Sequence, residues 1–359
     1  MSQQTFKVPV VFWFKLFLTI TLTIPLLVTD IPVAKADTEV GGPIISDTTW
    51  TAANSPYIVV ASVEVWEGVT LTIEPGVTVK FDSEKSLQVN GELIAQGTDG
   101  NLITFTSNQA SPAPDDWGNI EFTSTAITTT MDAEGNYVSG SILQYCVVEY
   151  AGANANNAIR ARSLLIDHCT VQNNSAQGIY NPGTVDAPAR ITNSTVSNNS
   201  APSNGGGIYT EYSTVSGNTV SGNSALGNNG GGIYAPHSTV SGNTVSDNLV
   251  NSNNNKHAYG GGIYVSHSTV VSNLISSNSV TASGQATGTD FDAYGGGIYA
   301  ETSTLSSNTV SFNTSHTTSW SDDAYGGGIC AMNCIIGGNI VNNNQAIPPK
   351  PIFRTFPIE

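Results

Sequence analysis

Charged side chains are scarce in this chain, and basic ones are the scarcest. Only 11% of its 359 residues are charged, with 11 Lys and Arg against 27 Asp and Glu. The formal net charge of −16 disfavours nucleic acid and anionic membrane surfaces as partners, because both repel an acidic protein. Asn, Ser, Thr and Gly take the place of the charges. Their regular alternation with Val, Ile and Tyr favours ordered β structure over disorder.

Cysteine is also rare, and the four thiols are Cys146, Cys169, Cys330 and Cys334. No C-x-x-C pair occurs, so a zinc site is poorly supported. An even number of cysteines in an exported chain permits disulfides. The first two are 23 residues apart, which matches one early repeat and predicts either a disulfide or two stacked free thiols. A bridge between the last two would fasten the last repeat.

Long apolar runs are missing except at the start of the chain. Lys7 and Lys15 flank the beginning of an apolar stretch at residues 16–28, which is short for a membrane span. Ala-Lys-Ala at residues 34–36 fits a small-x-small cleavage site. We therefore predict a signal peptide at 1–36 and a secreted or cell-surface protein without a membrane span in its mature part. Removing 1–36 takes away three lysines and one aspartate and changes the net charge from −16 to −18.

The second half of the chain repeats Gly-Gly-Gly-Ile-Tyr or a near copy, beginning at residues 205, 230, 260, 295 and 326. A repeat of this length is typical of a solenoid. The intervals differ only because the stretch before each Gly-Gly-Gly changes length, at 224–229, 249–259, 279–294 and 314–325. We expect these insertions to lie as loops on one side of the stack.

Aligning the repeats produces three aliphatic columns, which predict three inward-facing strands in each coil and an all-β fold. The first column contains Ile166, Ile191, Val215, Val240, Val270, Leu305 and Ile336. The second contains Val171, Val196, Val220, Val245, Ile275, Val310 and Val341. The third contains Ile159, Ile179, Ile208, Ile233, Ile263, Ile298 and Ile329. We divide the mature chain into a cap with irregular coils (37–140), regular coils (141–345) and a Pro-rich tail (346–359).

Two asparagine columns accompany the aliphatic ones. Stacked asparagines form amide ladders along a β-solenoid and tolerate left-handed backbone angles at its corners. The first column is Asn218, Asn243, Asn273, Asn308 and Asn339. The second is Asn174, Asn199, Asn223, Asn248, Asn278, Asn313 and Asn344. We interpret both as structural; an Asn-lined ligand track is the alternative.

These repeats resemble right-handed parallel β-helix proteins of the pectate-lyase-like superfamily. The pairing of Gly205-Gly206-Gly207-Ile208 with Val215-Ser216-Gly217-Asn218 is similar to repeats of the polymorphic outer-membrane autotransporter family. Residues 69–107 look like the opening coils of many secreted bacterial β-helix proteins. The resemblance implies a right-handed parallel β-helix with three faces, over about residues 69–345. It implies little about function, since this fold hosts lyases, hydrolases, epimerases and adhesins.

Candidate catalytic groups are few. Arg160 and Arg162 alternate on one strand but have no acidic cluster at matching positions, so we interpret them as a solvated pair. His237 precedes Ser238, yet neighbouring strand residues point to opposite faces, which excludes a nucleophile pair. The best carboxylates are Asp290, Asp292, Asp322 and Asp323 in the insertions. They could solubilise loops, hold Ca²⁺ or act in hydrolysis; we expect no other cofactor.

Aromatic residues form the most suggestive surface. Tyrosines next to the inward Ile should face outward, and a second set stands just before Gly-Gly-Gly. Such rings suit stacking on sugars or on one another. The first set is Tyr180, Tyr209, Tyr234, Tyr264 and Tyr299. The second is Tyr259, Tyr294 and Tyr325, with Phe291 and Trp320 nearby.

We therefore predict a non-catalytic binding or adhesion module whose partner is a polysaccharide or a cell-surface protein. The expected site is the flank that carries the insertions, between residues 251 and 325, because rigid scaffolds present ligand contacts on loops. A polysaccharide lyase or glycoside hydrolase is the main alternative. Ice binding is another, through the outward column Thr214, Thr239, Thr269 and Thr304.

Overall fold

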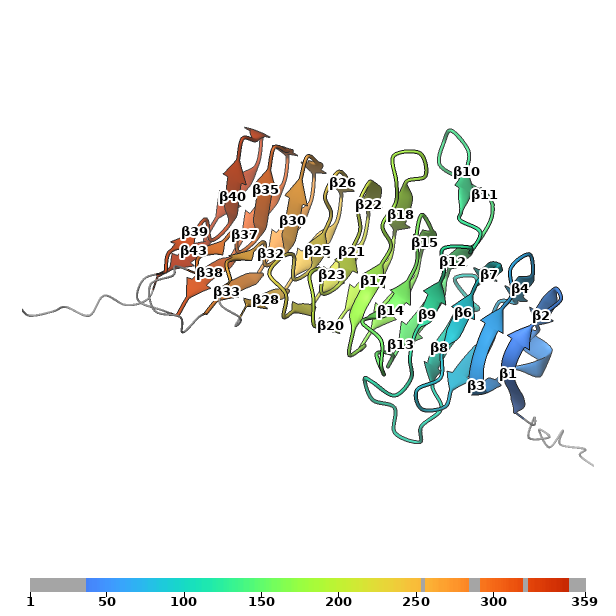
Figure 1. Ribbon diagram of the computed structural model, residues 1–359. Helices are drawn as coiled ribbons and strands as arrows, with labels where there is room; N and C mark the ends of the chain where they lie inside the picture. Colours follow the sequence, from blue (N-terminus) through green and yellow to red (C-terminus); the bar gives the residue numbers. More distant parts are fainter. Residues whose placement is uncertain (1–36, 253–255, 284–290, 319–321, 349–359) are drawn as a thin grey trace, which may run out of the picture. The chain divides into compact units, whose positions relative to one another are not determined.

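The computed structural model describes residues 37–252, 256–283, 291–318 and 322–348, and the predicted signal peptide lies outside them. The described chain winds into a stack of coils whose strands pair in parallel with the coils before and after (Figure 1). Apart from one 3₁₀ turn, η1 (Ala52–Asn54), its regular structure is all β. The predicted parallel β-solenoid is confirmed.

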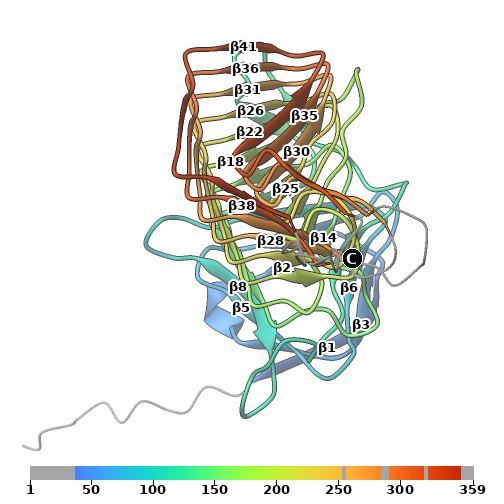
Figure 2. The same ribbon diagram turned by 90° about the vertical axis from the view of Figure 1, so that its left-hand side faces the viewer.

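The first face of the stack is one sheet of eleven strands, whose later members are seen one above another in the upper part of Figure 2. Its inward residues are the first aliphatic column, and the Thr214–Thr239–Thr269–Thr304 column lies in register on its outer side. Ice binding through that column stays a prediction. The strands are β2 (Thr48–Trp50), β4 (Thr70–Ile73), β7 (Glu92–Gln96), β12 (Ile142–Gln144), β15 (Leu165–Asp167), β18 (Ala189–Thr192), β22 (Ser213–Ser216), β26 (Thr239–Ser241), β31 (Thr269–Val271), β36 (Thr304–Ser306) and β41 (Ile335–Gly337).

The second and third faces belong to one sheet, because the long strand β3 (Tyr57–Val65) pairs with β5 through its first half and with β6 through its second. Strand β1 (Thr38–Ile44) pairs with β3. The second face continues through β5 (Thr78–Phe81), β8 (Ile103–Ser107), β13 (Cys146–Glu149), β16 (Thr170–Gln172), β19 (Thr195–Ser197), β23 (Thr219–Ser221), β27 (Thr244–Ser246), β32 (Leu274–Ser276), β37 (Thr309–Ser311) and β42 (Ile340–Asn342). The third face continues through β6 (Leu87–Val89), β9 (Ile120–Phe122), β14 (Asn157–Arg160), β17 (Gln177–Tyr180), β21 (Ile208–Tyr209), β25 (Ile233–Tyr234), β30 (Ile263–Ser266), β35 (Ile298–Glu301) and β40 (Ile329–Met332).

The insertions are more ordered than the loops that the sequence predicted. Each begins with a short strand of a six-stranded sheet, and the later ones end with a strand of a three-stranded sheet. Val250, Ala258, Val280, Ala282 and Ala293 are buried between these strands as a second small core. The first sheet contains β20 (Ser200–Ala201), β24 (Ser224–Ala225), β28 (Leu249–Ser252), β33 (Ser279–Ala282), β38 (Thr314–Thr317) and β43 (Gln345–Ile347). The second contains β29 (Ala258–Tyr259), β34 (Ala293–Tyr294) and β39 (Ala324–Tyr325), and a separate hairpin joins β10 (Thr130–Met131) to β11 (Tyr137–Ser139).

Corners between the faces combine a left-handed residue with a ladder asparagine. Gly217 has φ +68°, a conformation in which glycine avoids the steric cost of a side chain, and it precedes Asn218. Asn218 Nδ2 donates to Asn243 Oδ1 at 3.0 Å, and the same Oδ1 accepts the Asn218 backbone N–H at 2.9 Å. Equivalent bonds link both predicted asparagine columns from coil to coil. The structural interpretation of the asparagines is confirmed.

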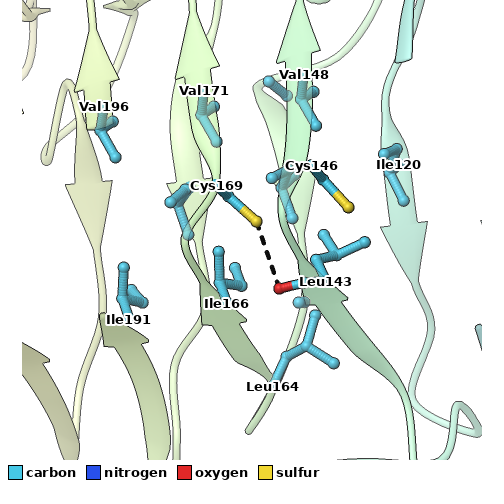
Figure 3. Close-up of a cluster of buried hydrophobic side chains, with 14 of the residues drawn as sticks. Ile120, Leu143, Cys146, Val148, Leu164, Ile166, Cys169, Val171, Ile191 and Val196 are labelled. Carbon is cyan, nitrogen blue, oxygen red and sulfur yellow. Dashed lines mark hydrogen bonds between the residues drawn. The ribbon is translucent and has the colours of Figure 1, made fainter. Parts of the chain in front are cut away.

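Buried aliphatic residues fill the interior along the stack (Figure 3). Cys146 and Cys169 belong to this core in consecutive coils, and both thiols are free. Each thiol bonds a backbone carbonyl, with Cys169 Sγ 3.4 Å from Leu143 O, and burial raises the pKa of the Cys146 thiol. Cys330 and Cys334 are free and half-buried. The structure therefore has stacked thiols in the core, which was one of the two predicted alternatives.

Candidate functional site

The outward residues of the third face form one continuous row along the stack. Parallel pairing places each residue of the row directly beside the next, so polar and charged groups in the early coils lead into tyrosines in the later ones. In chain order the row is Glu64, Gln88, Glu121, Arg160, Tyr180, Tyr209, Tyr234, Tyr264, Tyr299 and Cys330. The row therefore has a charged end and an aromatic end.

A groove of about 730 Å³ lies over the middle of this row. Its floor includes Glu121, Arg160, Tyr180 and Tyr209. The segments that enter the third-face strands border it, and residues 153–157 form the longest of them. Most of the bordering side chains are amides or hydroxyls, which donate and accept hydrogen bonds without carrying charge. They include Ser86, Asn119, Asn154, Asn156, Asn157, Gln177, Ser203 and Asn204.

An ion pair marks the charged part of the floor. Arg160 Nη1 lies 2.5 Å from Glu121 Oε1, and both side chains keep access to solvent, with exposed fractions of 49% and 30%. The Arg160 guanidinium is therefore already paired with an anion from the preceding coil. Glu121 is thus a single carboxylate beside Arg160, because the two strands are in register although the two residues are 39 positions apart in the sequence.

Stacked rings make up the aromatic part of the floor. The centroids of Tyr180 and Tyr209 are 4.9 Å apart, and those of Tyr209 and Tyr234 are 4.6 Å apart. Burial and neighbouring groups favour the neutral phenols, so the pKa of Tyr234 rises to about 12 and that of Tyr209 rises further. The Tyr209 hydroxyl donates to Glu211 Oε1 at 2.6 Å. The rings are thus held in fixed, half-buried positions.

The second set of tyrosines packs on top of the later part of the floor. Tyr259, Tyr294 and Tyr325 stack on one another at 5.0 Å, as the sequence predicted. Tyr259 also meets Tyr299 edge to face at 4.7 Å, and Tyr299 is only 6% exposed. Tyr299 faces outward from its strand, as predicted, but the insertion covers the ring and shields it from solvent. The aromatic floor is open in the early coils and covered in the late ones.

The acidic residues of the insertions mainly hold this second set in place. Tyr294 donates its hydroxyl to Asp292 Oδ2 at 2.8 Å, and Tyr325 donates to Asp323 Oδ2 at 2.9 Å. The backbone N–H of Asp323 donates to Asp292 Oδ1 at 2.8 Å. Within the described ranges, no group of three or more His, Cys, Asp and Glu is arranged to hold a metal ion. Asp290 lies outside those ranges, and Ca²⁺ binding stays a prediction.

Two of the remaining predicted site residues are interior. Phe291 is 7% exposed, and its N–H donates to Asp322 Oδ1 at 3.0 Å. Asp322 is 2% exposed, so the expectation that it solubilises a loop is wrong for this buried carboxylate. Trp320 lies outside the described residues. The half-buried first-set tyrosines Tyr234 and Tyr264 stack at 4.9 Å in the floor, as expected.

Sequence reasoning missed the charged half of the row. Glu64, Gln88 and Glu121 come from irregular early coils, where no repeated motif shows which residues share a column. In the sequence of those strands, only the alternation of apolar and polar residues was a usable signal. It shows which residues face outward, but not which residue of the next coil each one pairs with. The groove precedes residues 251–325 along the chain, and none of its lining residues belongs to the four insertions. The predicted site at 251–325 stays a prediction.

Comparison with known proteins agrees with this architecture. A model of the pectate-lyase like beta helix domain matches residues 42–166, and a model of the right handed beta helix region matches residues 130–315, more than half of the chain. The protein belongs to the right-handed β-helix family. The expected handedness and fold are thus confirmed, and the likeness to autotransporter repeats stays a prediction.

Two individual proteins are similar to this chain, one over a short stretch and one at low sequence identity. Protein bark beetle of Drosophila melanogaster is 42% identical over 81 residues, which are 21% of this chain and 3% of that protein. The solved Dettilon tailspike protein is 14% identical with a TM-score of 0.24, over 82% of this chain and 61% of that one. This β-helix chain therefore spans only a small part of the first protein and less than two thirds of the second. Neither likeness identifies a ligand.

Described residues of this β-helix protein include no helix with the length and apolar character needed to cross a membrane.

Proposed function

We propose that the protein is a secreted or cell-surface β-helix that binds polysaccharide in the groove over Arg160, Tyr180 and Tyr209. The observation that carries this proposal is the open aromatic floor, which continues into polar groups within one groove. Sugar rings present apolar C–H faces that pack against aromatic side chains, here against the ring edges that the mutually stacked tyrosines leave open, while sugar hydroxyls need hydrogen-bond partners. Floor and border supply these two kinds of contact.

The spacing of the floor suits a polymer better than a single sugar. Consecutive coils repeat the row at ring separations of 4.6–4.9 Å, so the surface extends along the stack and does not end in a closed pocket. A chain lying along this row gains from several weak contacts at once. Because neighbouring tyrosines already stabilise one another, the surface is ordered before the ligand arrives, which lowers the entropic cost of binding.

Polysaccharide cleavage is a second candidate, favoured by the presence of Glu84 and Glu121 in the same groove. A glycosidase needs two carboxyl groups on opposite sides of the scissile bond. We favour binding, because the Glu121 carboxylate is held in an ion pair with Arg160 and would have to leave that pair to act on a scissile bond. Release of reducing or unsaturated ends from any bound polymer, abolished by E121Q, would establish cleavage in place of simple binding.

A glycan array tests the location with two double variants. Y180A/Y209A removes the open floor, and Y294A/Y325A removes two rings of the insertion flank. We expect Y180A/Y209A to abolish binding to every glycan that the wild type binds. We expect Y294A/Y325A to change the affinity for those glycans by less than about threefold. The reverse pattern would place the ligand at residues 251–325. Unchanged binding in both variants would show that neither set of tyrosines contributes to glycan binding.

A further inference from the structure

The charges around the groove point to the kind of polysaccharide that it accepts. Three carboxylates accompany the floor: Glu84 lines the groove, Glu121 belongs to its floor, and Glu211 bonds the hydroxyl of Tyr209. Arg160 is the one basic residue among the groove-lining side chains. Arg162, two residues further on, is exposed but does not line it.

The ion pair with Glu121 limits which ligand groups Arg160 can bind. An unpaired guanidinium in a sugar-binding groove would offer a bidentate site for the carboxylate of an acidic sugar. Here Arg160 Nη1 is already paired with Glu121 at 2.5 Å, so an incoming carboxylate would share the guanidinium with Glu121 and would lie close to that like charge. The other carboxylates then add repulsion that nothing in the groove offsets, and the whole chain is acidic as well.

We propose that the groove selects neutral polysaccharides and rejects acidic ones, and that the Glu121–Arg160 pair is the specificity-determining element. This inference rests on the proposed function. The amide and hydroxyl border fits it, because these groups pair with sugar hydroxyls at no electrostatic cost. The carboxylates around the groove repel acidic polymers, and this repulsion adds specificity to the attractive contacts of the tyrosine floor.

The experiment compares two sets of polymers at low ionic strength. Mannan, mixed-linkage β-glucan, xyloglucan and dextran are the neutral probes, and polygalacturonate and alginate are the acidic ones. Affinity electrophoresis is run with wild type, E121Q, E84Q and the double variant E84Q/E121Q. D99N is the matched control, since it removes the same charge from an exposed turn outside the groove. Thermal melts verify that every variant is folded.

We expect the wild type to bind at least one neutral polymer and neither acidic one. E121Q frees Arg160, and affinity for polygalacturonate should rise by about three- to tenfold for each carboxylate removed. This gain should shrink as salt screens the charges, and D99N should show none of it.

The outcomes separate the two proposals. Wild type that binds no neutral polymer overturns the proposed function and this inference together. Wild type that binds polygalacturonate as tightly as a neutral polymer overturns the inference alone. A folded E121Q protein that gains nothing over D99N for either acidic polymer rejects the role assigned to the Glu121–Arg160 pair.

Discussion

Replacing one ladder asparagine, Asn243→Ala, should destabilise the whole stack. Asn243 is 1% exposed and its side chain takes part in four hydrogen bonds. Its Oδ1 accepts both the backbone N–H and Nδ2 of Asn218, at 2.9 and 3.0 Å. Its Nδ2 donates to Val215 O and to Asn273 Oδ1, both at 2.9 Å. Alanine removes all four and leaves buried donors and acceptors in the neighbouring coils without these partners.

The expected loss follows from these four bonds. A buried hydrogen bond contributes about 1 kcal/mol net, and a group left unsatisfied costs about 1–3 kcal/mol. Asn218 Nδ2 keeps its bond to Ile191 O, so part of the network survives. We therefore expect the free energy of unfolding to fall by about 3–5 kcal/mol. Folded proteins are stable by only about 5–15 kcal/mol, so this is a large fraction.

Urea denaturation followed by circular dichroism measures the change. Asn251→Ala is the matched control, because Asn251 is a half-buried residue of β28 at an outward position of the strand and not in either ladder. The control should change the free energy of unfolding by less than about 0.5 kcal/mol. A loss below about 1 kcal/mol for Asn243→Ala would show that the amide ladders contribute little to stability and that the aliphatic columns suffice.

Three further predictions concern packing, tyrosine ionisation and thiol access. Gly231→Ala should lower the free energy of unfolding by more than about 2 kcal/mol, because the new Cβ would lie 2.4 Å from Gly261 O. Gly100→Ala, with open space around its Cβ, should be neutral in the same urea assay. Folding raises the pKa of Tyr234 to about 12 because burial favours the neutral phenol. The contribution of this phenol to the free energy of unfolding should be complete below about pH 10 and should be lost as the pH rises toward 12. In a pH titration, the absorbance of the Tyr234 tyrosinate should appear at higher pH than that of a free tyrosine. Ellman's reagent should modify half-buried Cys330 well before Cys146, which is 1% exposed, and equal rates would contradict the described burial.

Much of the fold could be predicted because the repeats make registers visible. Gly-Gly-Gly-Ile and the asparagines recur at equivalent positions, so alignment alone places Val215 beside Val240 and Asn218 beside Asn243, as the structure confirms. The strands within the insertions could not be predicted in this way. Their inward residues vary from Ala225 to Val250 to Ser315, and a column of mixed size and polarity does not stand out.

The candidate site was harder to predict than the fold. The tyrosine columns were visible in the repeats, but whether a ring is open or covered depends on how an insertion folds back, as with Tyr259 over Tyr299. The Glu121–Arg160 contact joins strands 39 residues apart across an irregular coil of unpredictable length. Both features are tertiary, and local patterns carry no information on them.

Hydroxyl-radical footprinting of the tyrosines, with and without a bound neutral polysaccharide, tests the central claim most directly. Oxidation of a ring reports its exposure, so a ligand in the groove should protect Tyr180 and Tyr209. Tyr325, which is 42% exposed on the insertion flank, should be oxidised equally in both samples. Protection of Tyr325, with Tyr180 and Tyr209 unchanged, would contradict the account and place the ligand on the insertions.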